Sequence, residues 1–217
     1  ANAIAGTLAL TALATLIAVP MGLMAGVYLA EFSDDSKAGD FSRFSANVLM
    51  GMPSIIVGIF AYTLVVVPLG HFSGYAGALA LAILMLPVIT RTTEDMLRLV
   101  PNTLRESALA LGAPRWKVTL GIVFRAAKGG LITGILLAVA RVSGETAPLL
   151  FTALNSPYWF SSLGEPTPNL TVTIFNYAMS PYPDWQQKAW GASLLITAGV
   201  LIMTILARFF LREKKFG

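Results

Sequence analysis

Long apolar stretches alternate with short polar segments along the whole chain. A helix that crosses a bilayer needs about 20 mostly apolar residues, and five stretches approach or reach that length. They cover residues 6–30, 46–69, 75–90, 129–150 and 190–210. The third is short, but it reaches full length if the side chain of Arg91 extends to the membrane interface. The pattern therefore predicts an all-α fold, a polytopic transmembrane helical bundle with five spans.

The composition agrees with a lipid bilayer as the main surrounding of the chain. Of 217 residues, 56% are hydrophobic and 12% are charged, whereas about 25% of the residues of a soluble domain are charged. There is no cysteine and one histidine, His71, so we expect no disulfide, no metal site and no cofactor. Nucleic-acid binding is not supported either, because the basic residues are not interleaved with an exposed aromatic platform.

Lysine and arginine are concentrated in alternate polar segments. The first such segment holds Lys37 and Arg43, residues 91–128 hold seven basic residues, and the last ten residues hold four more. The segments on the opposite side hold only Lys188. Basic residues in short loops mark the cytoplasmic side, so we expect the first residue of the chain to lie on the periplasmic side and the last in the cytoplasm.

The polar segment over residues 93–127 has the pattern of a helix, a sharp turn and a second helix. Thr103 and Glu106 have the spacing of a capping box, which would begin a short helix. Gly112 fits the position after a helix where a left-handed residue is needed. Pro114 suits the first turn of the next helix. This segment is expected to project as a compact knob on the cytoplasmic side.

The same segment resembles the EAA-x3-G loop of ABC importer permeases. The matching positions are Glu106, Ser107, Ala108, Gly112 and Ala113. Ser107 replaces the usual alanine, and Phe124 with the next residue stands near where the family has a leucine–proline pair. The resemblance implies that the knob is a coupling helix seated in a groove of an ATPase subunit. The alternative is that Glu106 only caps a helix and Gly112 only ends one.

The fourth predicted span contains two charged residues, Arg141 and Glu145. Each costs at least about 2.5–3.5 kcal/mol within a membrane helix, so such residues usually face a partner or a water-filled path. Residues four apart lie on one helix face; Thr146 is a nearby donor, as is Ser143, although Ser143 points away from that face. The pair is either a structural salt bridge or the lining of a translocation pathway. We favour the pathway, because we expect no other charged residue inside the membrane.

The whole chain resembles the A-type permease subunits of the bacterial phosphate-specific (Pst) ABC transport system, members of the MetI-like, binding-protein-dependent permease family. The strings that carry the resemblance lie at residues 53–58, 91–97, 141–153 and 178–187. It implies a MetI-like permease core, a single domain over residues 1–217 that lacks an N-terminal span, and translocation of inorganic phosphate. The implied partners are a nucleotide-binding ATPase dimer, a sister permease forming a heterodimer, and a periplasmic phosphate-binding protein.

Residues 151–188 are expected to form a long periplasmic loop. The loop contains several tyrosines and tryptophans, which favour the headgroup level of a membrane. Its five prolines argue against one continuous helix, although residues 171–177 could form a short interfacial helix. The aromatic residues serve either as interface anchors or as contacts for a substrate-delivering binding protein.

The chain has no G-x-x-x-x-G-K-[ST] loop, so we expect no ATPase site of its own and assign ATP hydrolysis to the partner subunit. A permease for another oxyanion, such as sulfate or molybdate, is the main alternative. A passive anion channel is a further alternative, but such a channel would not need the knob. An intramembrane enzyme with Glu145 as its base would need a second catalytic group, for which the predicted spans offer no Asp, His or Cys.

Overall fold

The computed structural model describes residues 1–33 and 36–210, with side chains described as far as residue 205. In this part of the chain every regular element is a helix. Four helices are long and apolar enough to span a membrane, and a bent pair makes five if it counts as one span. The expected all-α bundle of five predicted spans is confirmed on that count.

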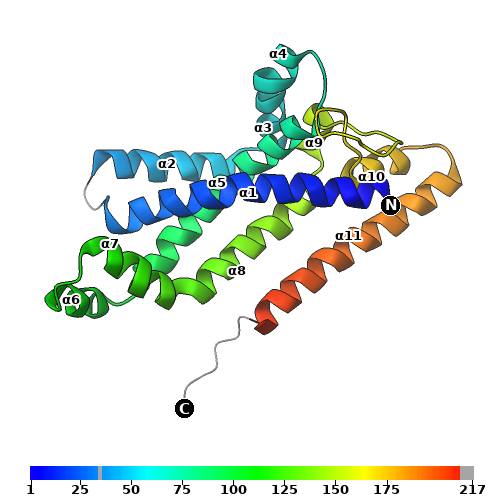
Figure 1. The fold of residues 1–217 in the computed structure, drawn as a ribbon. Coiled ribbons are helices and arrows are strands. Elements are labelled where there is room, and N and C mark those ends of the chain that lie inside the picture. The colour runs from blue at the N-terminus through cyan, green and yellow to red at the C-terminus, as the bar shows by residue number, and fades with distance from the viewer. Residues whose placement is uncertain (34–35, 211–217) are drawn as a thin grey trace.

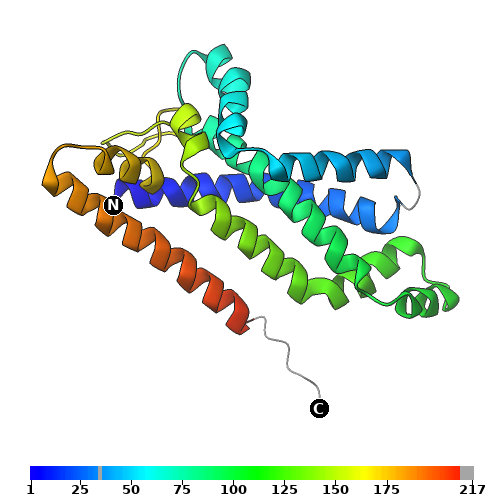
Figure 2. The ribbon, with the colours of Figure 1, turned by 180° about the vertical axis from the view of Figure 1, so that it is seen from behind.

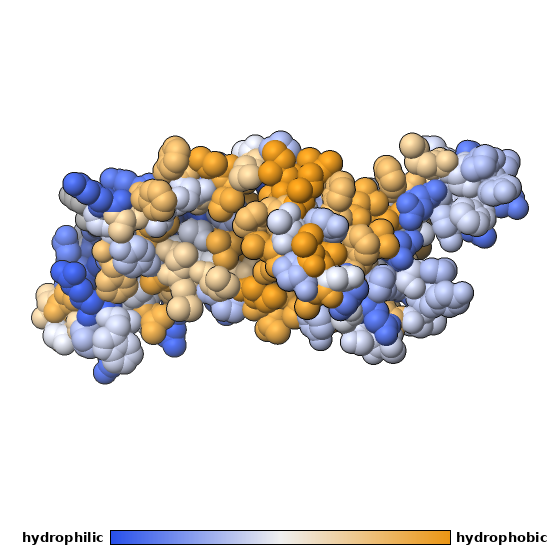
Figure 3. All heavy atoms as spheres, turned by 90° about the horizontal axis from the view of Figure 1, so that it is seen from above, coloured by the Kyte–Doolittle hydropathy of each residue, from blue (hydrophilic) through white to orange (hydrophobic). Residues whose placement is uncertain are grey.

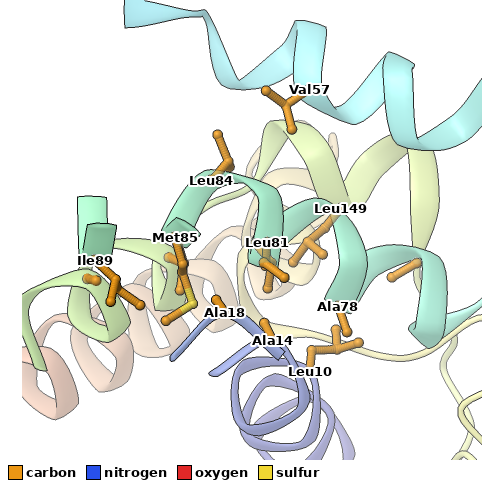
Figure 4. Packing of buried hydrophobic residues seen from close by; sticks show 14 of the residues in the cluster. Leu10, Ala14, Ala18, Val57, Ala78, Leu81, Leu84, Met85, Ile89 and Leu149 are labelled. Carbon is orange, nitrogen blue, oxygen red and sulfur yellow. The ribbon is translucent and has the colours of Figure 1, made fainter. Parts of the chain in front are cut away.

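The centre of the bundle is the contact between α1 (Asn2–Glu31) and α5 (Gly74–Arg98). Small residues on α1 allow this contact: a Cβ added at Gly26 would lie 2.4 Å from the Cβ of Thr93. Such close approach is how membrane helices pack without a hydrophobic driving force. Figure 4 shows the core built around this contact, in which buried side chains of both helices meet, among them Leu10, Ala14, Leu81 and Met85.

The second predicted span, over residues 46–69, is not one continuous helix. It consists of α2 (Lys37–Gly51) and α3 (Ser54–Ala61), the π-helical turn η1 (Tyr62–Val66) and α4 (Val67–Leu69), bent by 104° after α2. Pro53 causes the bend, because a proline pushes the residue before it out of the helical region, and Met52 has ψ 138°. In Figures 1 and 2, α2 lies beside α1 while α3 and α4 turn away from both.

The remaining elements connect the two ends of the bundle. A cluster of short elements, α6 (Asn102–Ala110), α7 (Arg115–Val118) and the π-helical turn η2 (Thr119–Val123), leads into α8 (Phe124–Ser143). At the opposite end follow α9 (Ala147–Thr152) and α10 (Leu170–Ala178), which includes the short helix expected over residues 171–177. The last helix, α11 (Pro183–Phe210), packs against α10 and α8.

Hydrophobic residues form a band across the middle of the molecule, and hydrophilic residues gather at both ends (Figure 3). We call the end that carries Arg98, Arg105 and Arg115 the basic end, and the end formed by residues 153–169 the loop end. A wide apolar band between two polar ends is the surface expected of a protein in a bilayer. The chain is therefore a multi-pass membrane protein whose spans run between these two ends.

Candidate functional site

Arg141 lies in the last turn of α8, with Glu145 just beyond it. The Nε atom of Arg141 is 3.9 Å from Oε1 of Glu145, and their side chains are 49% and 17% exposed. Charge-assisted hydrogen bonds between such groups are normally about 2.7–2.9 Å long, so the two side chains form an ion pair without a hydrogen bond. The guanidinium donors of Arg141 are therefore accessible beside a carboxylate that balances their charge.

The expectation that one helix carries both residues is wrong. α8 ends at Ser143, and the chain continues irregularly until α9 begins at Ala147. Pro148 explains the break, because a proline ring inside a helix collides with the carbonyl four residues earlier, here that of Gly144. The carbonyl oxygen of Glu145 instead accepts a 2.9 Å hydrogen bond from the hydroxyl of Thr171 on α10. Glu145 is thus held by a second element rather than by helical spacing.

The other two predicted pathway residues differ in their positions. The hydroxyl of Ser143 donates to the carbonyl of Val139 at 2.8 Å. Its side chain lines an apolar cavity of about 600 Å³ between α1, α8 and α11. Thr146 caps the start of α9, where its carbonyl accepts from the N–H of Leu149 at 3.1 Å. The structure brings Arg141 and Glu145 together and leaves Ser143 on a different face.

A second charged cluster lies buried in the bundle at the basic end. The carboxylate of Glu94 on α5 is 2% exposed. It accepts hydrogen bonds from Arg43 on α2 at 2.7 Å and from Arg91 at 2.6 Å, and Arg98 lies 3.2 Å away. This buried carboxylate links α2 to α5, and loss of its arginine partners would leave an unpaired buried charge.

The polar pattern predicts residues 91–98 as part of the cytoplasmic segment, and therefore does not predict this cluster within the bundle. In the structure α5 continues as one helix to Arg98. The spacing of Arg91, Glu94 and Arg98 places all three on one helix face, and that spacing could have revealed a shared site. The contribution of Arg43, 51 residues away from Glu94, follows only from the packing of α2.

The knob is present at the basic end as α6, a turn at Gly112, and α7. Gly112 has φ +81°, which confirms the expected left-handed residue. The N–H of Gly112 donates to the carbonyl of Leu109 at 2.9 Å, and the N–H of Ala113 donates to that of Ala108 at 3.2 Å. These two bonds form the Schellman motif that ends a helix.

The predicted capping box is absent, since α6 begins after Pro101 without a side-chain cap. The hydroxyl of Ser107 bonds back to the carbonyl of Thr103, and Glu106 is exposed. What holds α6 is Arg105, whose guanidinium contacts Glu31 at 2.8 Å and the carbonyl of Leu97 at 2.7 Å. This leaves Leu111, 89% exposed, at the tip of the knob.

Apolar spans, a charged pair beside a helix break and an exposed knob at one end together define a membrane permease subunit. The sequence profile of the family "Binding-protein-dependent transport system inner membrane component" matches residues 18–215. The chain belongs to this family of inner membrane transport components.

Curated relatives and solved structures agree with this assignment. The phosphate transport system permease protein PstA of Yersinia pestis is 52% identical over 99% of the chain and 73% of its own length. PstA of Haemophilus influenzae is 50% identical over 99% and 76%. The fold is similar to a structure of the MetNI methionine ABC transporter, with a TM-score of 0.77 at 18% identity, covering 97% of this chain and 93% of the other. An amino acid ABC transporter has a TM-score of 0.70 at 19% identity, covering 95% and 89%.

Proposed function

We propose that this permease subunit carries inorganic phosphate across the bacterial inner membrane, driven by ATP hydrolysis on a partner subunit. The observation that carries the proposal is the half-exposed guanidinium of Arg141, 3.9 Å from Glu145 in the last turn of a spanning helix. Arginine presents a planar fork of donors that matches the oxygens of phosphate. Relatives with the printed name of phosphate transport permease, 46–52% identical over 98–99% of the chain, support the choice of cargo.

The Arg141–Glu145 ion pair would be a transient phosphate-binding site on the translocation pathway. A phosphate ion that meets Arg141 exchanges part of its hydration for charge-assisted hydrogen bonds. Glu145, held through its carbonyl by Thr171, limits the net positive charge and so prevents the anion from binding too tightly to leave. Thr146 stands next to this site, whereas Ser143 lies on another face of α8 and lines the apolar cavity.

The knob would transmit ATP-driven motion to the spans. Leu111 and Trp116 are 89% and 59% exposed at its surface, and exposed apolar groups of this kind fit a hydrophobic groove on another protein. Glu106, Ser107, Gly112 and Ala113 form the proposed contact with a nucleotide-binding ATPase. Ala108, the remaining residue of the motif, is 6% exposed and packs α6 against the bundle instead. Because Arg105 ties α6 to Glu31 at the end of α1, a push on the knob would reach the central helix directly.

The remaining assignments follow the charge distribution and the family. The basic end would face the cytoplasm, with the start of the chain outside and its last residues inside. Residues 93–127 would be the coupling segment and residues 151–188 the periplasmic loop of one permease domain. A sister permease and a periplasmic phosphate-binding protein would complete the transporter.

The decisive test is the ATPase activity of the complete transporter in proteoliposomes. Phosphate with its binding protein should stimulate ATP hydrolysis and be taken up, whereas sulfate and molybdate should do neither. Stimulation by sulfate or molybdate instead would assign a different oxyanion. Phosphate uptake that persists after the ATPase subunit is inactivated would identify a passive channel and contradict the proposal.

A further inference from the structure

Thr171, near the start of α10, contacts both Glu145 and a residue of the loop end. It is buried, and its hydroxyl donates to the carbonyl oxygen of Glu145 at 2.9 Å. The same hydroxyl lies 3.1 Å from Oδ1 of Asn169. Since a hydroxyl has one hydrogen to donate, the shorter distance assigns it to Glu145. Thr171 therefore connects the proposed phosphate site to Asn169.

Asn169 is the N-cap of α10, is fully buried, and has both polar atoms of its side chain hydrogen-bonded. Its Oδ1 accepts from the N–H of Val172 at 2.9 Å. Its Nδ2 donates to the carbonyls of Leu154 at 3.0 Å and Thr167 at 3.2 Å. Leu154 has φ +55°, a strained conformation for a bulky residue that persists only where its surroundings hold it. Asn169 thus fastens the strained chain after α9 to the start of α10.

The position of Glu145 depends on α10 because the ion pair alone holds it weakly. Nε of Arg141 and Oε1 of Glu145 are 3.9 Å apart, too far for a hydrogen bond. α8 ends before Glu145, which lies in the irregular stretch that leads into α9. α10 is itself anchored to α1, because the N–H of Leu170 donates to the hydroxyl of Thr7 at 2.9 Å. The bond from Thr171 therefore joins Glu145 to an anchored helix.

We propose that Thr171 and Asn169 are positioning residues for phosphate transport, through which the loop end controls the separation of Arg141 and Glu145. The inference rests on the proposed function, because it takes the ion pair as the phosphate site; neither positioning residue needs to touch the anion. While Asn169 holds the loop end, Glu145 stays beside Arg141 and offsets its charge. Displacement of the loop end would release Glu145 and free the guanidinium for phosphate, since an anion competes with a carboxylate for the same donors.

The first measurement is phosphate uptake by the complete transporter in proteoliposomes. Thr171→Val keeps the shape of the side chain but leaves the carbonyl of Glu145 without its hydroxyl partner. We expect uptake to fall about tenfold, the effect of losing one buried hydrogen bond, and Thr171→Ser, which keeps the hydroxyl, to retain most of the wild-type rate. Thr173→Val is the matched control. The hydroxyl of Thr173 donates at 2.6 Å to the carbonyl of Asn169, which keeps the N–H of Thr173 as a partner, so uptake should change less than about twofold.

The second measurement follows residue 145 directly and does not depend on transport. The 217 residues contain no cysteine, so Glu145→Cys introduces one thiol among them. Its labelling by a maleimide in the assembled transporter is read from the peptide that contains residue 145. Adding Thr171→Val should speed this labelling about tenfold, because the backbone there loses its anchor. Adding Asn169→Ser should also speed it, since serine keeps an N-cap acceptor but lacks the amide that fastens the loop end, whereas Thr173→Val should leave the rate unchanged.

Each part of the inference has its own contrary result. An unchanged labelling rate with Thr171→Val would overturn the positioning of Glu145, and an unchanged rate with Asn169→Ser would overturn control by the loop end. Normal uptake by Thr171→Val, or equal losses with Thr171→Val and Thr173→Val, would show that the Thr171 hydroxyl has no specific role in transport and would also overturn the inference. The proposed function fails separately, if phosphate does not stimulate the transporter or if Arg141→Gln transports phosphate normally.

Discussion

At the level of single residues, two charged sites in the bundle differ in how far their charges are already satisfied. Glu94 is buried and accepts hydrogen bonds of 2.7 Å and 2.6 Å, so it has little capacity left for a ligand. Arg141 is half-exposed and 3.9 Å from its partner. Because a structural salt bridge needs close and fully hydrogen-bonded geometry to repay desolvation, the geometry favours a structural role for Glu94 and a pathway role for Arg141.

We predict that Arg141→Gln abolishes phosphate uptake while the transporter still assembles. Glutamine keeps a polar, although shorter, side chain but removes the charge and the fork, and hydrogen bonds to charged groups contribute about 1.5–3 kcal/mol each. Assembly should persist because Arg141 makes one long ion pair and no side-chain hydrogen bond within the described residues. Uptake is measured in proteoliposomes, and assembly by co-purification of the subunits.

Arg125→Gln serves as the control for this prediction. It removes the same charge from the opposite end of α8, where the side chain is exposed, and uptake should be close to wild type. Normal uptake by Arg141→Gln would rule out the pathway role, and loss of assembly would make Arg141 a structural residue instead.

At the level of elements, the knob depends on a backbone conformation that few residues adopt. Gly112 has φ +81°, and a Cβ added there would meet nothing within 4 Å. The obstacle to substitution is therefore the backbone conformation, which costs about 1–3 kcal/mol for an ordinary residue, and not a lack of space. Docking would require that α6 end at this residue so that Leu111 stays at the tip.

We predict that Gly112→Val weakens co-purification of the ATPase subunit about fivefold or more, because a strain of at least about 1 kcal/mol shifts the turn by that factor. Gly112→Asn should be milder, since asparagine tolerates the left-handed region. The measurement is the ratio of ATPase to permease after affinity purification.

Gly121→Val is the matched control. Gly121 lies in η2 with a negative φ and equally open surroundings, so co-purification should be unchanged. A Gly112→Val transporter that retains its full complement of ATPase would argue against docking at the knob.

At the level of the whole molecule, the two polar ends differ in chemistry. The basic end combines the knob and the Glu94 cluster. The loop end is built from irregular chain between α9 and α10, fastened by Asn169, whose amide donates to the carbonyls of Leu154 and Thr167. The molecule therefore has one end that carries the knob and one end of irregular chain, joined by α1 and α5.

We predict that single cysteines at the two ends label from opposite sides of the membrane. The 217 residues contain no cysteine, so Lys117→Cys at the knob and Ser161→Cys in the loop end each introduce one thiol, both at exposed positions. In intact spheroplasts a membrane-impermeant maleimide should label only Ser161→Cys, and Lys117→Cys should react after lysis. Labelling of Lys117→Cys in intact spheroplasts would reverse the proposed orientation.

Local features of this protein could be predicted from its sequence. The apolar stretches indicated the spans, since a chain in lipid must satisfy its backbone hydrogen bonds within each segment and therefore forms helices. The turn at Gly112 also followed from the sequence, because a left-handed helix end depends on a single residue. Each of these features needs only neighbours along the chain.

Which charged residues pair with each other, and where the helices bend, can be seen only in the tertiary structure. Pro53 lies among apolar residues, and only the structure shows that α3 turns by 104° there. The pairing of Glu94 with Arg43 and the contact of Glu145 with Thr171 join residues from different helices. Hydropathy cannot predict such partners, because a lipid-facing surface and a buried helix contact are equally apolar, and only the packing of the helices distinguishes them.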